Sequence, residues 1–368
     1  MAGPGLSVSA TDVTAGQQVA VTLSRSDNKG PYPVSDRDKV EEMSEPDVTV
    51  VVVPRERFSL IPRSLESLYT ETKVPFRLVY VDGRSPARIK HHLETEAKRR
   101  GFRLIRSPRY LAPTEARNLG LSQASGKYVV FIDNDVLVSP GWLGALVRCA
   151  DETGAWLVGP LYCFGEPAFT KVHMAGGTAH VEVREGGRYL SEKHHFPGRP
   201  LEEVRPKIQR MRTELMEFHC LLVRTEVFER LGPLDAGLLS DFEHIDLCLA
   251  VHEAGGTIYL EPEALVNWVT PPPLAWSDLP YFMLRWSDAW NRASLRHFRE
   301  KWRLVEEDPN GHYDFVTSYR KLALWPLRSV IRRALGWRRG TWVERHALFP
   351  IEEALNRLFI PEKFGQRH

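Results

Sequence analysis

The chain has 368 residues, 43% of them hydrophobic and 26% charged, which suits one large α/β domain with extensions or two smaller domains. Its formal net charge of +2 gives no reason to expect a nucleic-acid partner. The four cysteines form no CxxC pair and the N-terminus lacks the features of a signal peptide, so we expect free thiols in a reducing, cytoplasmic compartment.

Residues 1–46 are small, polar or charged, and we expect an irregular tail and linker. A continuous β-branched run at 48–53 then predicts a strand that is buried on both faces of a parallel sheet. Further strands are expected at 76–82, 102–105 and 128–132, and helices at 59–69, 86–100 and 114–124. This alternation predicts a doubly wound, mostly parallel α/β sheet with flanking helices, whose ligands bind outside the carboxyl ends of the strands.

Acidic residues stand at two of these strand ends. Asp82 follows the second strand, and Asp133-Asn134-Asp135 follows the fourth. Two carboxylates two residues apart suit Mg²⁺ or Mn²⁺, which keep coordination sites open for diphosphate oxygens. The alternative is an Asx turn that closes the strand, and the three residues by themselves favour that alternative.

A longer pattern surrounds this stretch. The sequence ARNLGL at 116–121 is followed by a turn at Ser125-Gly126 and by the strand that enters Asp133. This pattern resembles the family 2 glycosyltransferases, and the resemblance continues through RTEVFERLGPLD at 224–235 and EHIDLCL at 243–249. It implies a GT-A domain at 47–305, a nucleotide-sugar donor, and a divalent cation, Mn²⁺ or Mg²⁺, on Asp133 and Asp135.

The resemblance also implies donor contacts. The residues expected to bind the nucleotide sugar are Pro54, Glu56, Asp82, Arg117, Asp133 and Asn134. Asp82 can accept hydrogen bonds from a nucleobase, with a strand-end turn before Gly83 as the alternative. Arg117 can donate to a phosphate, with a salt bridge on the helix surface as the alternative.

The helix that begins near Glu243 supplies the candidate catalytic residues. Glu243 and Asp246 are three positions apart and share a helix face, and His244 lies on its flank. Either Glu243 or His244 can act as the general base, and Glu243 is favoured. For Asp246, a supporting or capping role is as well supported as a catalytic role. The later histidine that often ligates the metal in this family falls near Trp268, so the third metal ligand stays open.

The acceptor side carries weaker signals. Glycine pairs within 164–189 indicate a hairpin that covers the donor, and 194–212 has the polar composition of a lid. Glu217-Phe218-His219 either lines the acceptor pocket or belongs to a strand, and the strand is favoured. Aromatic residues at four-residue spacing within 279–302 indicate a helix packed on the sheet, and His194-His195 is expected at the surface.

The segment 306–368 is expected to be a basic, amphipathic helical extension. Seven basic and no acidic residues lie within 319–343, interleaved with leucines and tryptophans. Such a segment can lie in the headgroup region of an anionic membrane, with a helix packed on the catalytic domain as the alternative. The sequence favours the packed helix with a solvated basic face, and peripheral contact with the inner face of an anionic membrane is the second interpretation.

Together with these features, the resemblance implies a metal-dependent, inverting transfer from a nucleotide-diphosphate sugar, with a UDP-sugar favoured, to a hydroxyl of a glycan, lipid or small molecule. The alternative is an inactive nucleotide- or glycan-binding module. A nucleotidyltransferase or a dinucleotide-binding dehydrogenase is disfavoured, because the turn at Pro54–Arg57 contains no glycine with which to cradle phosphates.

Overall fold

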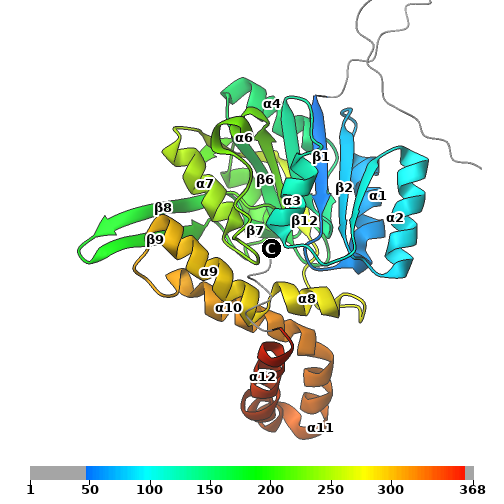
Figure 1. Ribbon diagram of the computed structural model, residues 1–368, viewed down its shortest axis with the longest axis vertical. Coiled ribbons are helices and arrows are strands. Elements are labelled where there is room, and N and C mark those ends of the chain that lie inside the picture. The colour runs from blue at the N-terminus through cyan, green and yellow to red at the C-terminus, as the bar shows by residue number, and fades with distance from the viewer. Residues whose placement is uncertain (1–46, 361–368) are drawn as a thin grey trace, which may run out of the picture. The chain divides into compact units, whose positions relative to one another are not determined.

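The structure is a computed structural model and describes residues 47–360; the expected tail at 1–46 and the last residues of the extension lie outside this range. A ten-stranded mixed sheet forms its centre, in the order β10-β12-β6-β11-β4-β1-β2-β3, with β5 beside β12 and β7 beside β6 (Figure 1). The strands are β1 (Val48–Val53), β2 (Arg77–Gly83), β3 (Arg103–Ser107), β4 (Tyr128–Asp133), β5 (Val136–Val138), β6 (Leu157–Phe164), β7 (Lys171–Met174), β8 (Gly177–Arg184), β9 (Gly187–His194), β10 (Met211–Thr213), β11 (Cys220–Arg224) and β12 (Ile258–Trp268).

The strands β3, β2, β1 and β4 run parallel, with Val53 of β1 beside Asp133 of β4. Every residue of β1 is buried, as the β-branched run predicts for a strand covered on both faces. Gly120 allows the helix that carries it to approach β1 closely, because a Cβ atom at this position would lie 2.1 Å from a methyl carbon of Val51. The predicted mostly parallel α/β sheet with flanking helices is confirmed.

Helices cover the sheet and cross its carboxyl edge. They are α1 (Ile61–Glu71), α2 (Ala87–Arg100), α3 (Pro113–Leu121), α4 (Trp142–Thr153), α5 (Leu201–Val204), α6 (Glu226–Leu231), α7 (Glu243–Glu253), α8 (Leu279–Arg285), α9 (Asp288–Trp302), α10 (His312–Arg320), α11 (Trp325–Val343) and α12 (Phe349–Phe359). The helices α8 to α10 lie across the edge where β1, β2 and β4 end (Figure 1). The Tyr281 hydroxyl fixes α8 there by donating to the Leu111 carbonyl at 2.8 Å.

The aromatic residues of α8 and α9 mainly serve packing. Phe282, Trp286 and Trp290 are 0 to 3% exposed. The three rings are buried as expected, but away from the core of the sheet: Phe282 and Trp286, which follows α8, cluster with Val316, and Trp290 clusters with Ala112 and Leu239.

The expected hairpin is present and begins and turns at its glycine pairs, but it spans Gly177 to His194 and not 164–189. Strands β8 and β9 pair over their full length, from Gly177 opposite His194 to Arg184 opposite Gly187. The tip is solvent-exposed, with Val183 76% exposed, and the hairpin extends away from the sheet (Figure 1). Only the base of the hairpin reaches the region of the strand ends.

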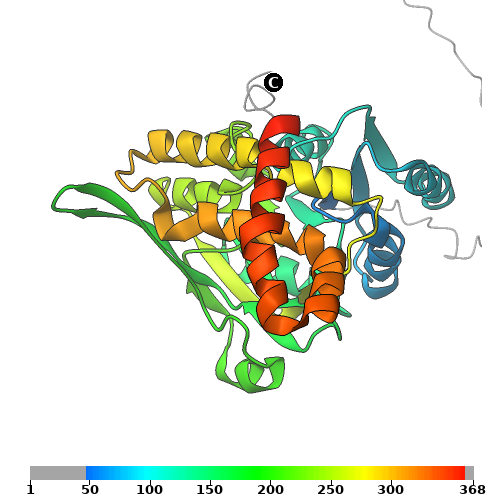
Figure 2. The same cartoon turned by 90° about the horizontal axis from the view of Figure 1, so that it is seen from below.

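The C-terminal segment forms a helical hairpin that turns at Gly336, inside α11, so that the second arm runs from the end of α11 into α12 (Figures 1 and 2). Glu344, in the π-helical turn Glu344–Leu348, accepts hydrogen bonds from Arg328 and Arg332 and so ties the two arms together. Buried Arg320 joins α10 to α12 through Glu352. Among residues 47–360, no helix combines the length and apolarity needed to cross a bilayer.

Candidate active site

Asp133 ends β4 in a strongly cationic setting. Its side chain is fully buried and accepts hydrogen bonds from Arg117 at 3.1 Å and from Arg55 at 3.2 Å. The Nδ1 atom of His219 lies 3.3 Å from Oδ2. Burial opposes ionisation, but His219, Arg55 and Arg117 together hold the pKa of Asp133 well below its usual range. Asp133 is therefore an anion whose charge is already balanced by protein groups.

Asp135 has the opposite environment. Its carboxylate is fully buried, and neither oxygen has a hydrogen-bond partner within the described chain. Burial, with the nearby charges of Glu56 and Asp133, raises the pKa of Asp135 to about 8. A buried carboxylate without a partner is costly, and a divalent cation would satisfy both its charge and its lone pairs. Asp135 therefore fits the expected metal.

Arg117 connects this strand end to the candidate catalytic helix. It is fully buried and donates to Asp133 with one terminal nitrogen and to Glu243 with the other, each at 3.1 Å. Its guanidinium carbon lies 4.1 Å from the centre of the Phe218 ring. The alternative of a salt bridge on the helix surface is wrong, because α3 turns Arg117 towards the site.

Three of the residues expected to bind the donor make hydrogen bonds to other residues of the chain. The Asn134 Oδ1 atom accepts from the Arg55 amide at 3.0 Å, which fixes the turn after β1. Buried Glu56 accepts from the Tyr319 hydroxyl of α10 at 2.8 Å. The Pro54 carbonyl lies 3.4 Å from the Tyr281 hydroxyl. Glu56 and Pro54 thus contact α10 and α8, whereas Asn134 fixes the turn that carries Arg55.

Asp82 forms the strand-end turn that was its alternative role. Its oxygens accept from the Ser85 amide at 2.9 Å and from the Ser85 hydroxyl at 3.0 Å, and Arg106 pairs with it. It is 1% exposed and ends β2, next to β1 in the sheet. A nucleobase contact stays a prediction.

The first residues of α7 separate into two groups. Glu243 and His244 both line a cavity, whereas Asp246 binds Lys301 and the Trp302 indole, each at 2.8 Å. The Glu243 Oε2 atom is buried without a partner among residues 47–360, and the His244 Nδ1 atom lies 3.8 Å from Asp241. The structure thus brings Glu243 and His244 together in one site and directs Asp246 to α9.

The cavity has a volume of about 100 Å³ and is lined by several segments of the chain. Arg55 comes from the first turn, Glu217 to His219 from the turn before β11, Glu243 and His244 from α7, and His312 and Tyr319 from α10. The favoured assignment of 217–219 to a strand is wrong, because these residues precede β11 and face the cavity.

Histidines that had no motif also reach this cavity. His173 from β7, His194 from β9 and His312 from α10 line it, so the expectation that His194 lies on the surface is wrong. Trp268, where the family's later histidine was expected, stacks on His219 with ring centres 4.7 Å apart. This set could not be predicted from residue spacing, because its members are scattered along the chain and are brought together by the sheet topology.

Comparison with known proteins gives this geometry a context. Residues 49–232 match the sequence model of glycosyl transferase family 2. Pre-mycofactocin glycosyltransferase of Mycobacterium tuberculosis H37Rv is 25% identical over 226 residues, which cover 60% of this chain and 42% of that protein. Polypeptide N-acetylgalactosaminyltransferase 12 of Mus musculus is 26% identical over 179 residues, which cover 48% of this chain and 30% of that protein. The chain therefore spans less than half the length of these relatives.

A solved structure has a similar fold. The crystal structure of GalNAc-T7 with UDP, GalNAc and Mn²⁺ has a TM-score of 0.50 and 19% sequence identity. The match covers 80% of this chain and 58% of that one. At this identity the likeness establishes a shared fold.

Proposed function

Because the chain belongs to glycosyl transferase family 2, we propose that it transfers a sugar from a nucleoside diphosphate sugar to an acceptor hydroxyl. The observation that carries this proposal is the pair of strand-end carboxylates: Asp135 is buried and has no hydrogen-bond partner among residues 47–360, while Asp133 is linked through Arg117 to Glu243. Asp135 is suited to bind a cation, and Glu243, at the other end of this link, is a carboxylate suited to accept a proton. The acceptor is a glycan, a lipid or a small molecule.

Asp135, with Asp133 beside it, would hold Mg²⁺ or Mn²⁺ against the donor diphosphate. A bound cation supplies Lewis acidity that offsets the charge of the departing diphosphate. Arg55 lies on the cavity wall, 3.2 Å from Asp133, and adds a fixed positive charge on the same side. A UDP-sugar is the first donor to test, since the crystal structure with the similar fold contains UDP.

Glu243 is placed to accept the proton of the acceptor hydroxyl. Arg117 holds Oε1, which leaves the unpartnered Oε2 free to receive that proton. His244 lines the same cavity and is the alternative base. A direct attack by the activated hydroxyl would invert the configuration at the anomeric carbon, and NMR of the product would establish the configuration.

The proposal is tested by replacing Asp135 with asparagine, which keeps the shape of the side chain and removes its charge. UDP binding is measured by calorimetry with Mn²⁺ and then with EDTA. We expect Asp135→Asn to lose the metal-dependent part of the affinity. Asp151→Asn, the same change at an exposed aspartate, should bind as the wild type does. Equal UDP binding with EDTA and in Asp135→Asn would refute the cation assignment.

An inactive binding module is the second candidate function. It is favoured by His244 and Trp268, which stand where the family pattern has an acidic residue and a histidine. A donor panel that includes UDP-, GDP- and dTDP-sugars separates the two candidates. Transfer or hydrolysis of any bound donor supports the enzyme, and tight donor binding without turnover across acceptors supports the module.

A further inference from the structure

Three histidines surround one carboxylate beside the proposed donor site. The Nε2 atoms of His173 and His219 each lie 3.0 Å from Oε2 of Glu217, and that of His194 lies 3.5 Å from Oε1. The four residues come from β7, β9 and the turn before β11. Imidazole nitrogens that converge on a carboxylate form a donor set that proteins use for transition metals.

The spacing of these atoms suits a metal ion. One donor atom from each of His173, Glu217 and His219 lies within 4.8 Å of the others. Tetrahedral bonds of about 2.0–2.1 Å would place neighbouring donor atoms about 3.3 Å apart. The observed contacts of 3.0 Å are close to that separation, so small side-chain shifts would accommodate an ion.

His219 is the member that points to a missing ligand. The residue is 1% exposed, yet neither ring nitrogen makes a hydrogen bond of acceptable geometry in the part of the chain that the structure describes. Both nitrogens nevertheless lie close to carboxylates, with Nε2 near Glu217 and Nδ1 3.3 Å from Asp133. Buried polar atoms are seldom left without partners, and a metal on Nε2 would provide one.

The surroundings hold the rings in a suitable orientation. Trp268 stacks on His219 with an interplanar angle of 27° and meets His173 edge-on at 5.6 Å. Asp133 beside Nδ1 favours a proton on that nitrogen, which turns the lone pair of Nε2 towards Glu217. A carboxylate behind a ligating histidine is the usual arrangement around metal sites.

We propose that His173, Glu217 and His219 bind a divalent transition metal of the Zn²⁺ class, at a site distinct from Asp135. His194 is placed to complete the coordination, directly or through water. Two imidazoles and a carboxylate favour Zn²⁺ over Mg²⁺, which prefers oxygen ligands. The His219 ring would lie between such an ion and Asp133, so the site would adjoin the proposed donor site without sharing a ligand with Asp135. Binding at this site does not require sugar transfer.

The test uses the full chain, stripped of metal with EDTA and titrated with Zn²⁺ by calorimetry in excess Mg²⁺. We expect one equivalent of Zn²⁺ to bind and Co²⁺, as a visible-light probe, to occupy the same site. His173→Ala should weaken Zn²⁺ binding by more than about 10-fold. His195→Ala removes the histidine next to His194 and should leave the affinity unchanged.

The two metal proposals fail separately. Asp135→Asn should lose metal-dependent UDP binding and keep Zn²⁺ binding, whereas His173→Ala should do the reverse. Glu217→Gln, which preserves side-chain volume, carries the same test if circular dichroism shows that His173→Ala is unfolded. Absence of saturable Zn²⁺ binding by the wild type would overturn the proposal. So would wild-type affinity in either folded variant.

Discussion

Arg117 shows how one side chain organises the site. It is fully buried between the carboxylates of Asp133 and Glu243, and no other described residue joins the end of β4 directly to the start of α7 in this way. A buried arginine with two carboxylate partners fixes both of them through directed, charge-assisted hydrogen bonds. The distance between the proposed metal side and the proposed base is therefore set by a single guanidinium group.

Replacing Arg117 should destabilise the fold as well as the site. Arg117→Ala leaves Asp133 and Glu243 buried without that partner, and we expect a loss of roughly 3–5 kcal/mol in the free energy of unfolding. Urea denaturation followed by circular dichroism measures the change. Arg148→Ala breaks an exposed ion pair with Glu263 and should cost less than about 1 kcal/mol. Similar losses in both variants would show that the buried bridge contributes little.

The assignment of the base is also decided at single residues. Glu243→Gln should reduce turnover by orders of magnitude and leave donor binding intact, because only the proton acceptor is lost. His244→Ala should retain measurable turnover. Initial rates and donor dissociation constants for the two variants supply the comparison. The opposite ranking would make His244 the base, and near-normal rates in both would remove the start of α7 from the catalytic centre.

Residues within one local pattern were predictable from the sequence, and residues joined by topology were not. Asp133 and Asp135 follow a recognisable buried strand, and Glu243 and His244 begin a recognisable helix. The contact between His219 and Asp133 depends on β11 lying beside β4, a pairing that leaves no mark in residue spacing. The environment of Asp135 depends in the same way on Arg55 and Glu56 from another strand end.

At the scale of elements, α10 closes the cavity. The Nε2 atom of His312 lies 2.8 Å from Oε2 of Glu192 in β9, and its Nδ1 atom lies 3.3 Å from Oδ2 of Asp241, before α7. The Tyr319 hydroxyl of the same helix donates to Glu56. A cavity of about 100 Å³ is smaller than the roughly 300–1,000 Å³ typical of ligand pockets. We therefore expect α10 or its neighbours to move when donor and acceptor bind.

The free energy of unfolding should depend on pH through the contact of His312, in α10, with Asp241 and Glu192. Burial opposes the charge on His312, but Asp241 and Glu192 raise its pKa to about 10. Because the folded pKa lies above the ordinary 6.5, this stabilisation is full below pH 6.5 and is lost as pH rises through about 10. We expect His312→Gln to lower the free energy of unfolding at pH 7 by roughly 3 kcal/mol, with a smaller difference above pH 10.

Urea denaturation of the wild type and of His312→Gln at both pH values measures this difference in unfolding free energy. Other groups that titrate near pH 10 contribute equally to both proteins, so their contributions cancel. His91→Gln, at an exposed position of α2, should change stability at neither pH. The same difference at pH 7 and above pH 10 would contradict a charged His312.

The element pattern was predictable for the parallel half of the sheet and less so elsewhere. The β-branched run at β1 and the helical spacing of α1 to α3 are local signals. The position of α8 to α10 across the strand ends depends on contacts such as Ser59 with Asp278 and Tyr281 with Leu111, which join segments more than 150 residues apart. Amphipathic spacing shows that such helices pack, without showing where.

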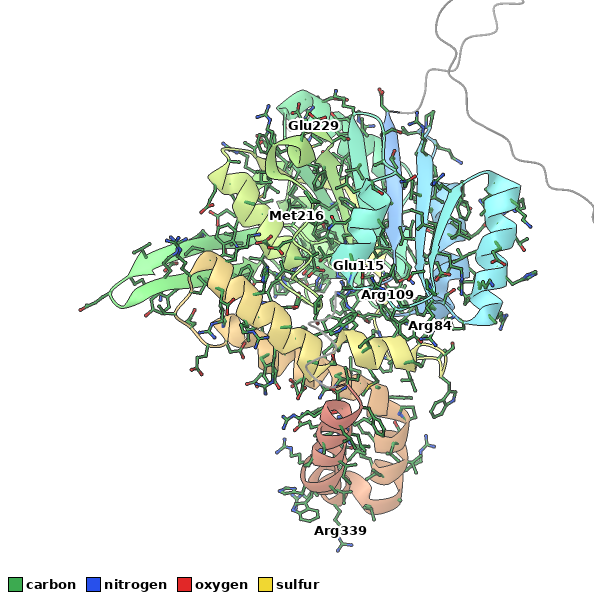
Figure 3. All side chains as sticks on the ribbon, in the orientation of Figure 1. Arg84, Arg109, Glu115, Met216, Glu229 and Arg339 are labelled. Carbon is green, nitrogen blue, oxygen red and sulfur yellow. The ribbon has the colours of Figure 1, made fainter. Side chains whose placement is uncertain are left out.

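At the scale of the whole molecule, the hairpin of α11 and α12 is the largest exposed apolar feature of the described chain. Its exposed large side chains are Trp325, Leu327, Val330, Leu335, Trp337, Trp342, Ile351, Leu355, Leu358 and Phe359. The basic residues are less available than the sequence suggested, because Arg320 is buried and Arg328 and Arg332 bind Glu344. Arg333, Arg338 and Arg339 are exposed, and Arg339 lies at the far tip of the hairpin (Figure 3).

We expect this hairpin to bind an anionic membrane surface. Tryptophans beside exposed arginines suit the headgroup region, where each cation contributes about 1 kcal/mol. The intact protein should float with phosphatidylglycerol liposomes at low salt and release as salt screens the charges. Replacing both Arg338 and Arg339 by alanine should weaken partitioning by about 2 kcal/mol, or roughly 30-fold.

The matched control removes the same charge from another exposed surface. Arg88→Ala with Lys98→Ala, both on α2, should leave flotation unchanged if the hairpin makes the contact. Trp337→Ala with Trp342→Ala should weaken flotation while keeping its salt dependence, because these rings contribute apolar burial and no charge. Equal flotation on neutral phosphatidylcholine would indicate apolar adsorption without charge recognition. Failure of the wild type to float at low salt would leave the alternative expected from the sequence, a helix packed on the catalytic domain with a solvated basic face.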